Sequence, residues 1–500
     1  MSHFHGAAPR SKEPRAESDR IISNGSISEG EAYLVSWKNE SLTKLFNPAT
    51  IAVIGASERP DRLGALSMIA LDGFEGEVIP VNPNHKTIKS KQCFPRIADI
   101  PKPVDLALIC LPEPAIPKAI EECAAVGVKA AIIFAAGYKE LGAEGEAEQR
   151  KIKKLVDDAH IAVIGPNCLG AGNINIDMNA TFFPHPQPLK KGGVAIVSQS
   201  GGVCGLMLYF AVESDTGVSK FASVGNRVNI EFHDLLRYLA NDDETSVICM
   251  FVEGTESGRE MYEAMTQVSA KKPIVVFKVG KTPIARQAAL SHTGSLAGNH
   301  RIYSGAIKQS KAIEADSVQE MMDTAKILSM CPNLGKGKSV GIVTHTLGVA
   351  LIAAQTLEER GVALPLPTER TQSIVQGILN MPVDIPIRNP IDLLAQGWAD
   401  PSIFSRAFEL AVKEDQYDAI MTVFAPNYIE GIGGGMPIDN IIKVTKGVNK
   451  AVVSILSSPI TRKPPGALEL HNAGIPVFTS PHRAAAALAH ALRFARNKQV

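Results

Sequence analysis

From residue 50 onward, the sequence alternates short runs of β-branched residues with longer stretches of helical periodicity. Alternation of this kind is typical of parallel sheets whose strands are joined by helices. It recurs in three blocks, and 500 residues are too many for a single core. The sequence therefore predicts an α/β fold of three doubly wound domains, with ligand-binding loops at the carboxyl ends of the strands.

Two connectors divide these blocks, one rich in proline at 183–188 and one rich in glycine and lysine at 332–338. The polar first residues show little periodicity, and we expect them to form a disordered arm. The expected divisions are an arm over 1–45 and domains over 46–185, 186–332 and 339–500. The strongest expected strands are 51–55, 78–81, 105–111, 129–134, 161–165, 193–198, 246–254, 273–280, 339–345, 419–426, 451–456 and 475–480.

The composition excludes several classes of protein. The 51 basic residues balance 51 acidic ones and aromatic residues make up only 5%, which argues against binding to nucleic acid or to an anionic membrane. No apolar run reaches the roughly 18 residues that a membrane helix needs, and the N-terminus has no apolar signal core. The seven scattered cysteines indicate neither a disulfide framework nor a metal site, so we expect a cytoplasmic protein.

Two familiar nucleotide motifs are absent. The loop at 55–60 (GASERP) is not G-x-G-x-x-G, and 81–84 (VNPN) lacks the acid that would hold an NAD ribose. The segment 280–282 (GKT) fails as a P-loop because Val275 stands where a glycine is required. The first loop still offers a glycine turn, a serine and an arginine ahead of Gly64. It suits a phosphate-bearing adenine nucleotide other than NAD, the alternative being a plain strand-to-helix turn.

A histidine set among small residues is the main chemical signal, in SHTGSLAG at 291–298. Two upstream segments, 165–170 (GPNCLG) and 198–202 (SQSGG), offer backbone that an anion can approach closely. The second opens an apolar helix, whose free N–H groups and dipole favour a bound phosphate. Together these segments predict that His292 carries a phosphoryl group.

Two further side chains fit this chemistry. Glu253 ends a strand and is placed to accept from the His292 ring N–H, which would set the nitrogen that faces the phosphate. Ser200 would contribute a hydroxyl at the helix start. The alternatives are a surface acid for Glu253 and an ordinary helix cap for Ser200.

The order of motifs along the chain resembles a known family. VIGAS, VNP, GPNCLG, VSQSGG, VGN, VEG, KPIVVFK and SHTGSLAG follow one another as in the α subunit of the NDP-forming acyl-CoA synthetases, such as ADP-forming acetate–CoA ligase, and more distantly that of succinyl-CoA synthetase. The resemblance covers about residues 46–500. It implies a Rossmann-like CoA-binding domain followed by two flavodoxin-like domains of the succinyl-CoA ligase type. In the third domain the loop 344–348 departs from the family's glycine-rich form.

The resemblance assigns roles to individual residues. His292 would carry the phosphoryl group with Glu253 as its partner, and no residue would bind a metal. CoA would contact Gly55, Ser57, Arg59, Pro60, Gly64, His85, Lys86, Ala135, Ala136 and Gly137. Phosphate and substrate would lie near Ser198, Ser200, Gly201, Gly202, Asn167 and Cys168, with burial as a packing residue the alternative for Cys168.

The family's ATP-grasp domains do not occur in this sequence. The resemblance therefore implies a separate β subunit that binds ATP or ADP with Mg²⁺, in a heterodimer or heterotetramer. The implied activity is reversible acid–CoA ligation through a phosphohistidine and an acyl phosphate. The small residues at 202–205 imply an acyl site not tuned to succinate. Two alternatives stay open, a regulatory subunit that binds CoA or acyl-CoA and a CoA transferase that uses no nucleotide.

Overall fold

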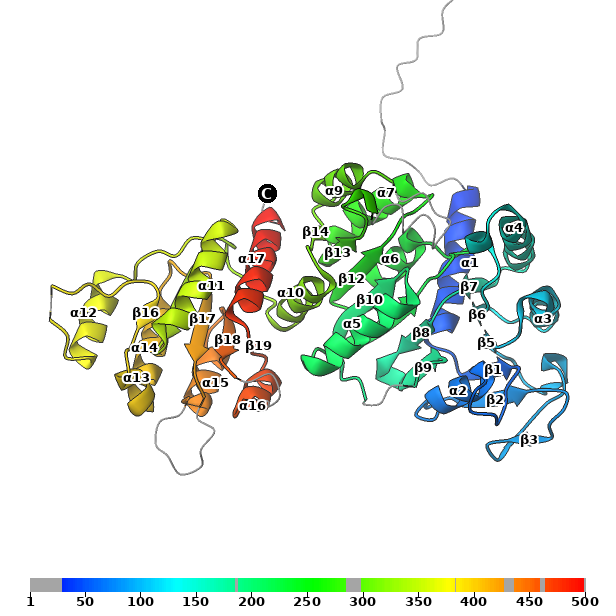
Figure 1. Cartoon of the computed structure of the whole chain (residues 1–500), viewed down its shortest axis with the longest axis horizontal. Helices are drawn as coiled ribbons and strands as arrows, with labels where there is room; N and C mark the ends of the chain where they lie inside the picture. The colour runs from blue at the N-terminus through cyan, green and yellow to red at the C-terminus, as the bar shows by residue number, and fades with distance from the viewer. Residues whose placement is uncertain are drawn as a thin grey trace, which may run out of the picture.

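Three sheets flanked by helices follow one another along the chain and lie in a row in the computed structural model (Figure 1). The structure describes residues 29–184, 188–284, 298–382, 384–426, 436–458 and 464–498. The predicted α/β class is confirmed. Within these ranges, no helix combines the length and apolarity that crossing a bilayer requires.

The first sheet is parallel throughout, in the order β2-β1-β5-β6-β7. Its strands are buried on both faces, which explains why they are nearly continuous apolar runs. The strands are β1 Thr50–Ile54, β2 Glu77–Val81, β5 Leu106–Ile109, β6 Ala130–Ile133 and β7 Ala162–Ile164, with the small hairpin β3 Thr87–Ile88 and β4 Lys91–Gln92. The helices are α2 Leu63–Ala70, α3 Ile116–Ala125 and α4 Ala143–Asp158.

The second sheet has the order β14-β13-β12-β10-β11-β8-β9 and is parallel except for β8 and β9, which are antiparallel. The chain therefore changes sheet between β7 and β8, earlier than the boundary expected near residue 185. The strands are β8 Gly170–Asn173, β9 Met178–Thr181, β10 Lys191–Ser198, β11 Val218–Ser223, β12 Val247–Val252, β13 Ile274–Lys278 and β14 Ile313–Glu314. The helices are α5 Gly201–Glu213, α6 Phe232–Ala240, α7 Gly258–Ser269, α9 His300–Gln309 and α10 Val318–Met330.

The third sheet is parallel, in the order β16-β15-β17-β18-β19. Its strands are β15 Val340–Thr344, β16 Ile391–Asp392, β17 Ala419–Phe424, β18 Ala451–Leu456 and β19 Val477–Phe478. Its helices are α11 Leu347–Glu359, α12 Glu369–Ile378, α13 Gln396–Ala399, α14 Pro401–Lys413, α15 Ile438–Lys446, α16 Ala467–Asn472 and α17 Pro481–Lys498.

The expected disordered arm is wrong for its second part, because helix α1 spans Glu29–Phe46. The helix packs against α6 of the second domain and against β6 and β7 of the first. Trp37, Leu42 and Leu45 are 7%, 1% and 0% exposed, and the Asn173 amide donates to the Phe46 carbonyl at 3.0 Å. Burial between two domains stabilises this helix. Local sequence periodicity does not reveal such tertiary packing. Residues 1–28 of the expected arm lie outside the described residues.

Two apolar cores run across the domain boundaries. One contains residues of the first and second sheets, and the other joins the second and third. At the second boundary α10 packs against α17 (Figure 1). There the Arg483 guanidinium contacts both carboxylate oxygens of the buried Asp323 at 2.8 Å. The three domains are therefore packed through continuous interiors rather than strung on linkers.

The unusual loop after β15 is held by His345. Its Nε2 atom accepts from the Ala425 backbone N–H at 3.0 Å, and its ring packs edge-on against Phe424 at 4.4 Å. The acceptor role requires the neutral ring, and burial lowers the pKa of His345 from 6.5 to about 4.

The unfolded chain therefore binds a proton at His345 at a higher pH than the folded chain does. Stability due to the neutral ring is complete above about pH 6.5 and is lost as the pH falls toward 4. We expect this ring to cost about 2 kcal/mol of unfolding free energy between pH 7.5 and pH 5. Urea unfolding at both pH values should show that His345→Gln, which keeps an acceptor but cannot titrate, loses less stability than the wild type. Equal losses in both proteins would contradict this assignment.

Candidate functional site

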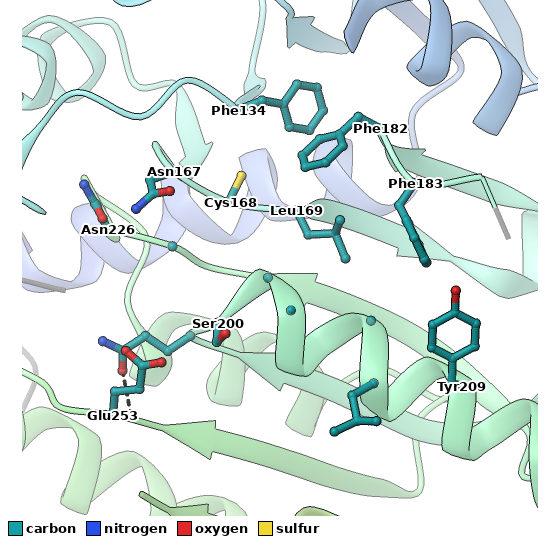
Figure 2. Close-up of a pocket in the computed structure, with 16 residues that line it drawn as sticks. Phe134, Asn167, Cys168, Leu169, Phe182, Phe183, Ser200, Tyr209, Asn226 and Glu253 are labelled. Carbon is teal, nitrogen blue, oxygen red and sulfur yellow. Dashed lines mark hydrogen bonds between the residues drawn. The ribbon is translucent and has the colours of Figure 1, made fainter. Parts of the chain in front are cut away.

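A cavity of about 700 Å³ opens at the N-terminus of α5 (Figure 2). We call it the α5 cavity. It is lined by helix α5 and by loops that follow strands of both the first and the second sheet. Its lining residues are Phe134, Asn167, Cys168, Leu169, Phe182, Phe183, Gln199, Ser200, Gly201, Gly202, Gly205, Leu206, Tyr209, Gly225, Asn226 and Glu253.

The start of α5 lies where the sequence predicted an anion site. Ser200 is the N-cap, with its side chain accepting from the Val203 backbone N–H at 3.4 Å. Ser200, Gly201 and Gly202 line the cavity, so the first free N–H groups of the helix lie at its wall. Ser198 does not line the cavity. Its buried hydroxyl donates to the Ser200 carbonyl at 2.7 Å and so stabilises the conformation of this loop.

Glu253 lies just beyond β12 and is 9% exposed. The side chain of Gln199 holds this corner, because its Oε1 atom accepts from the backbone N–H groups of Glu253 and Gly254 at 2.9 and 3.1 Å (Figure 2). A buried cation lies in the same region. Burial lowers the pKa of Lys278 to about 8, against the opposing influence of the Glu253 charge. The carboxylate thus has a fixed backbone and a cation in its electrostatic surroundings.

Asn167 and Cys168, which the resemblance assigned to phosphate and substrate, both line the cavity. The Asn167 backbone N–H donates to the Ala135 carbonyl at 2.9 Å, which ties this loop to the end of β6. The Cys168 thiol donates to the Ile133 carbonyl at 3.3 Å, and burial raises its pKa far above the usual range. A thiol that stays protonated is a poor nucleophile, which favours the interpretation of Cys168 as a packing residue.

Sequence reasoning missed the aromatic part of the cavity wall. The rings of Phe134 and Phe182 lie 5.4 Å apart at 90°, and those of Phe183 and Tyr209 lie 5.8 Å apart at 89°. These four side chains come from three separate segments, which no local pattern connects. One signal was available, because Gly201, Gly205 and Tyr209 recur every four residues along one face of α5.

A second cavity, of about 650 Å³, lies at the carboxyl edge of the first sheet. We call it the first-sheet cavity. It lies between β1 and β5, where the order of successive strands in the sheet reverses, which is the usual ligand position in such sheets. Its lining residues are Gly55, Ser57, Arg59, Arg62, Leu63, Gly64, Asn82, Cys110, Leu111, Pro112, Glu113, Ala135 and Ala136.

Two glycines shape this second cavity. Gly55 has φ +85°, which disfavours other residues, and a Cβ atom on Gly64 would lie 2.1 Å from the Gly55 carbonyl oxygen. The helix α2 can therefore start directly against the β1 loop. Arg59 and Arg62 line the rim, and their charges suit phosphate groups.

Six of the ten residues assigned to CoA by resemblance line the first-sheet cavity. Pro60, His85, Lys86 and Gly137 do not, and the first three are exposed. His85 and Lys86 follow β2 and lie past the rim, where Asn82 takes the lining position instead. His292 lies outside the described residues, which end at 284 and resume at 298.

Consecutive residues at the end of β6 line the two cavities. Phe134 lines the α5 cavity, and the next two residues, Ala135 and Ala136, line the first-sheet cavity. A ligand that bound along the first sheet would thus end beside the α5 cavity.

Comparisons with known proteins agree with this architecture. A family model described as "CoA binding domain" matches residues 49–173, and one described as "Succinyl-CoA ligase like flavodoxin domain" matches 191–328. The solved acetyl-coenzyme A synthetase 1 of Candidatus Korarchaeum cryptofilum, in complex with phosphate and ADP, has a TM-score of 0.82 and 30% identity. The match covers 92% of this chain and 97% of the solved chain.

Curated relatives give the same answer. The α subunit of acetate–CoA ligase [ADP-forming] II from Pyrococcus furiosus is 33% identical over 460 residues, 91% of this chain and 98% of its own length. Acetate–CoA ligase [ADP-forming] I from Archaeoglobus fulgidus is 37% identical over 385 residues, 77% of this chain but 55% of its own length. The resemblance stated from the motifs is confirmed, and this chain belongs to the family of ADP-forming acid–CoA ligases, where it matches proteins named as α subunits.

Proposed function

We propose that this chain is the α subunit of a ligase that joins a carboxylic acid to CoA at the expense of ATP, reversibly, with His292 as the phosphoryl carrier. One observation carries the proposal. Residues that the sequence singled out in three separate segments, at 167–168, 200–202 and 253, line a single cavity at a helix N-terminus. The residues that follow Phe134 of this cavity, Ala135 and Ala136, line a second cavity at the position expected for CoA.

The N-terminus of α5 supports a phosphate site. The helix has 13 residues, and its first turn carries no acidic side chain that would compete with an anion. Its dipole and free N–H groups stabilise a bound phosphate by ~0.3–2 kcal/mol per charge, depending on burial. Gly202 leaves open space above the first turn, since a Cβ atom there would meet nothing within 4 Å.

The first-sheet cavity fits CoA. Its glycine turn lets phosphate approach the backbone, and Arg59 and Arg62 supply positive charge at the rim. The pantetheine arm would follow Ala135 and Ala136 toward Phe134, so that its thiol would enter the α5 cavity. Because CoA is a substrate here, the residues need only hold and orient it.

In the proposed cycle, His292 takes a phosphoryl group from ATP on a separate ATP-grasp β subunit. The phosphorylated ring then passes this group to a carboxylate at the start of α5. The CoA thiol attacks the carbonyl carbon of the acyl phosphate, and phosphate leaves. Glu253 would accept from the other ring N–H of His292, which fixes the reacting tautomer. Gln199 would keep Glu253 in place.

Glu253→Gln should lower the rate of His292 phosphorylation about 100-fold, at the low end of the ~10²–10⁴ range for groups that direct a proton. Glutamine has no charge to stabilise the ring cation, so the pKa of His292 should fall. The pH at which labelling reaches half its maximum should therefore move to lower values. Rapid-quench labelling across pH measures both effects.

The matched control is Glu256→Gln. Glu256 is close in sequence and also acidic, but it is exposed and pairs with Lys139 at 3.4 Å. It should label at the wild-type rate with an unchanged pH profile. Equal losses in both variants would contradict the role of Glu253.

The proposal is tested by incubating the chain and its β subunit with γ-labelled ATP. Label should appear in the tryptic peptide 287–301, be stable in base and labile in acid, and leave when acid and CoA are added together. Absence of label with a β subunit that binds ATP would refute the proposal, as would label that acid and CoA do not remove.

A further inference from the structure

One face of α5 carries large apolar side chains that the core does not cover. Leu206 and Tyr209 are 41% and 44% exposed, and both line the α5 cavity. Across from them lie Phe182 and Phe183, which line the same cavity. Exposed apolar side chains gathered in a concave site are typical of a ligand pocket rather than of open surface.

The cavity has a polar end and an apolar end (Figure 2). Asn167, Asn226 and Glu253 lie on one side, Phe183 and Tyr209 on the other, and Ser200 lies between them. Gly201 and Tyr209 are separated by eight residues of helix, which at 1.5 Å per residue gives about 12 Å. The apolar end is therefore well beyond the reach of an acetyl group whose carboxylate is bound at the start of α5.

Gly205 keeps the space between the two ends open. The residue itself is buried, yet a Cβ atom built on it would meet nothing within 4 Å. A buried position with no neighbour for a side chain faces the hollow itself. In contrast, most buried glycines of this chain have backbone or side-chain atoms within that distance.

The charges of the side chains that line the α5 cavity limit the class of ligand further. Among the described residues that line the α5 cavity there is no lysine or arginine, and Glu253 is the one charged side chain. A second carboxylate at the apolar end would meet no cation and would be desolvated among aromatic rings, which is costly. The two edge-to-face pairs instead present ring faces and edges that suit another aromatic ring.

We propose that the acid activated by this ligase is an aromatic monocarboxylic acid, whose ring lies over Gly205 against Phe182, Phe183 and Tyr209 while its carboxylate lies near Ser200. This inference rests on the proposed ligase function. The cavity volume of about 700 Å³ falls within the ~300–1,000 Å³ typical of pockets for drug-sized ligands. It leaves room for a ring when the CoA thiol and a phosphoryl group occupy the polar end.

The test compares kcat/KM for 3-phenylpropenoate and acetate, with the chain in complex with its β subunit. In the wild type the aryl acid should exceed acetate at least about 10-fold, as expected when several apolar groups fill a matching pocket. Gly205→Leu places a branched side chain in the hollow, so the ratio of aryl acid to acetate should fall at least about 10-fold. A ratio is unaffected by partial misfolding, because both substrates use the same folded fraction.

Two further variants complete the test. Gly377→Leu is the matched control, because Gly377 also lies in a helix with open space around its Cβ position, but in the third domain. It should keep the wild-type ratio. Tyr209→Ala should lower the ratio by removing the end wall. A wild-type preference for acetate, or a ratio unchanged by Gly205→Leu, would overturn the inference. Labelling of His292 is measured on the same samples, so a failure of the ligase function is recognised separately by the absence of label.

Discussion

Replacing His292 by alanine should abolish phosphoryl labelling of this chain and lower ligase turnover by at least about 10³-fold. Alanine has no nitrogen to form the N–P bond, and removing a covalent nucleophile commonly costs between 10³-fold and ~10⁶-fold. Hydroxyls such as that of Ser200 cannot take over, because Ser200 already caps α5. Labelling with γ-labelled ATP and steady-state turnover measure the two losses.

The sequence makes one control indispensable. Trypsin cuts after Arg286 and Arg301, so the labelled peptide would contain His300 as well as His292. Mapping the peptide therefore cannot assign the site by itself. His300 begins α9, and its Nε2 atom lies 3.4 Å from Glu314. His300→Ala should keep the label. Label that survives in His292→Ala and vanishes in His300→Ala would assign the phosphorylation site to His300 instead.

Lys220→Ala should destabilise the second domain by about 3 kcal/mol, the lower end of the ~3–5 kcal/mol expected when one partner of a buried ion pair is removed. Lys220 is 1% exposed on β11, and its ammonium contacts both carboxylate oxygens of Asp242 at 2.9 Å and Glu244 at 2.6 Å. Removal of the ammonium leaves Asp242, whose side chain is only 12% exposed, without its cation. Glu244 is half-exposed and can turn to solvent, which moderates the loss.

Urea unfolding monitored by circular dichroism measures this loss. Lys190→Ala is the control, because Lys190 pairs with Asp215 at 2.9 Å while its own side chain is 42% exposed. Exposed pairs contribute about 0–1 kcal/mol, so this variant should stay close to the wild type. If the two variants lost equal stability, the burial of Lys220 would not be the cause.

The sequence predicted most strands of the three sheets but missed β8, β9, β11 and β14 of the second and β16 of the third. β11 was missed because Lys220 interrupts its apolar run, and the acids that neutralise this lysine come 22 and 24 residues later. β8 was missed because its sequence, GAGN, has little strand propensity. In both cases the strand forms because neighbouring segments pair with it and cover it.

The candidate site, too, could be predicted from the sequence only in part. Glycine loops and the cap at Ser200 could be predicted, because they depend on backbone geometry within a few residues. Glu253 could be placed at a strand end, but the support it receives from Gln199 required the structure. The aromatic wall joins Phe134, Phe182 and Tyr209 across two domains, and only the tertiary fold brings those segments together.

The cores that cross both domain boundaries have a consequence for the thermodynamics of binding. A protein whose domains hinge must use part of a ligand's binding energy to close, and it loses entropy as it does so. Here the first and second domains are already packed together, as are the second and third. The spacing between the two cavities is thus fixed before either is filled. The two cavities are preorganised by this apolar interior, and substitutions outside them, such as at the contact of α1 with α6, can alter catalysis by loosening the packing of the first domain on the second.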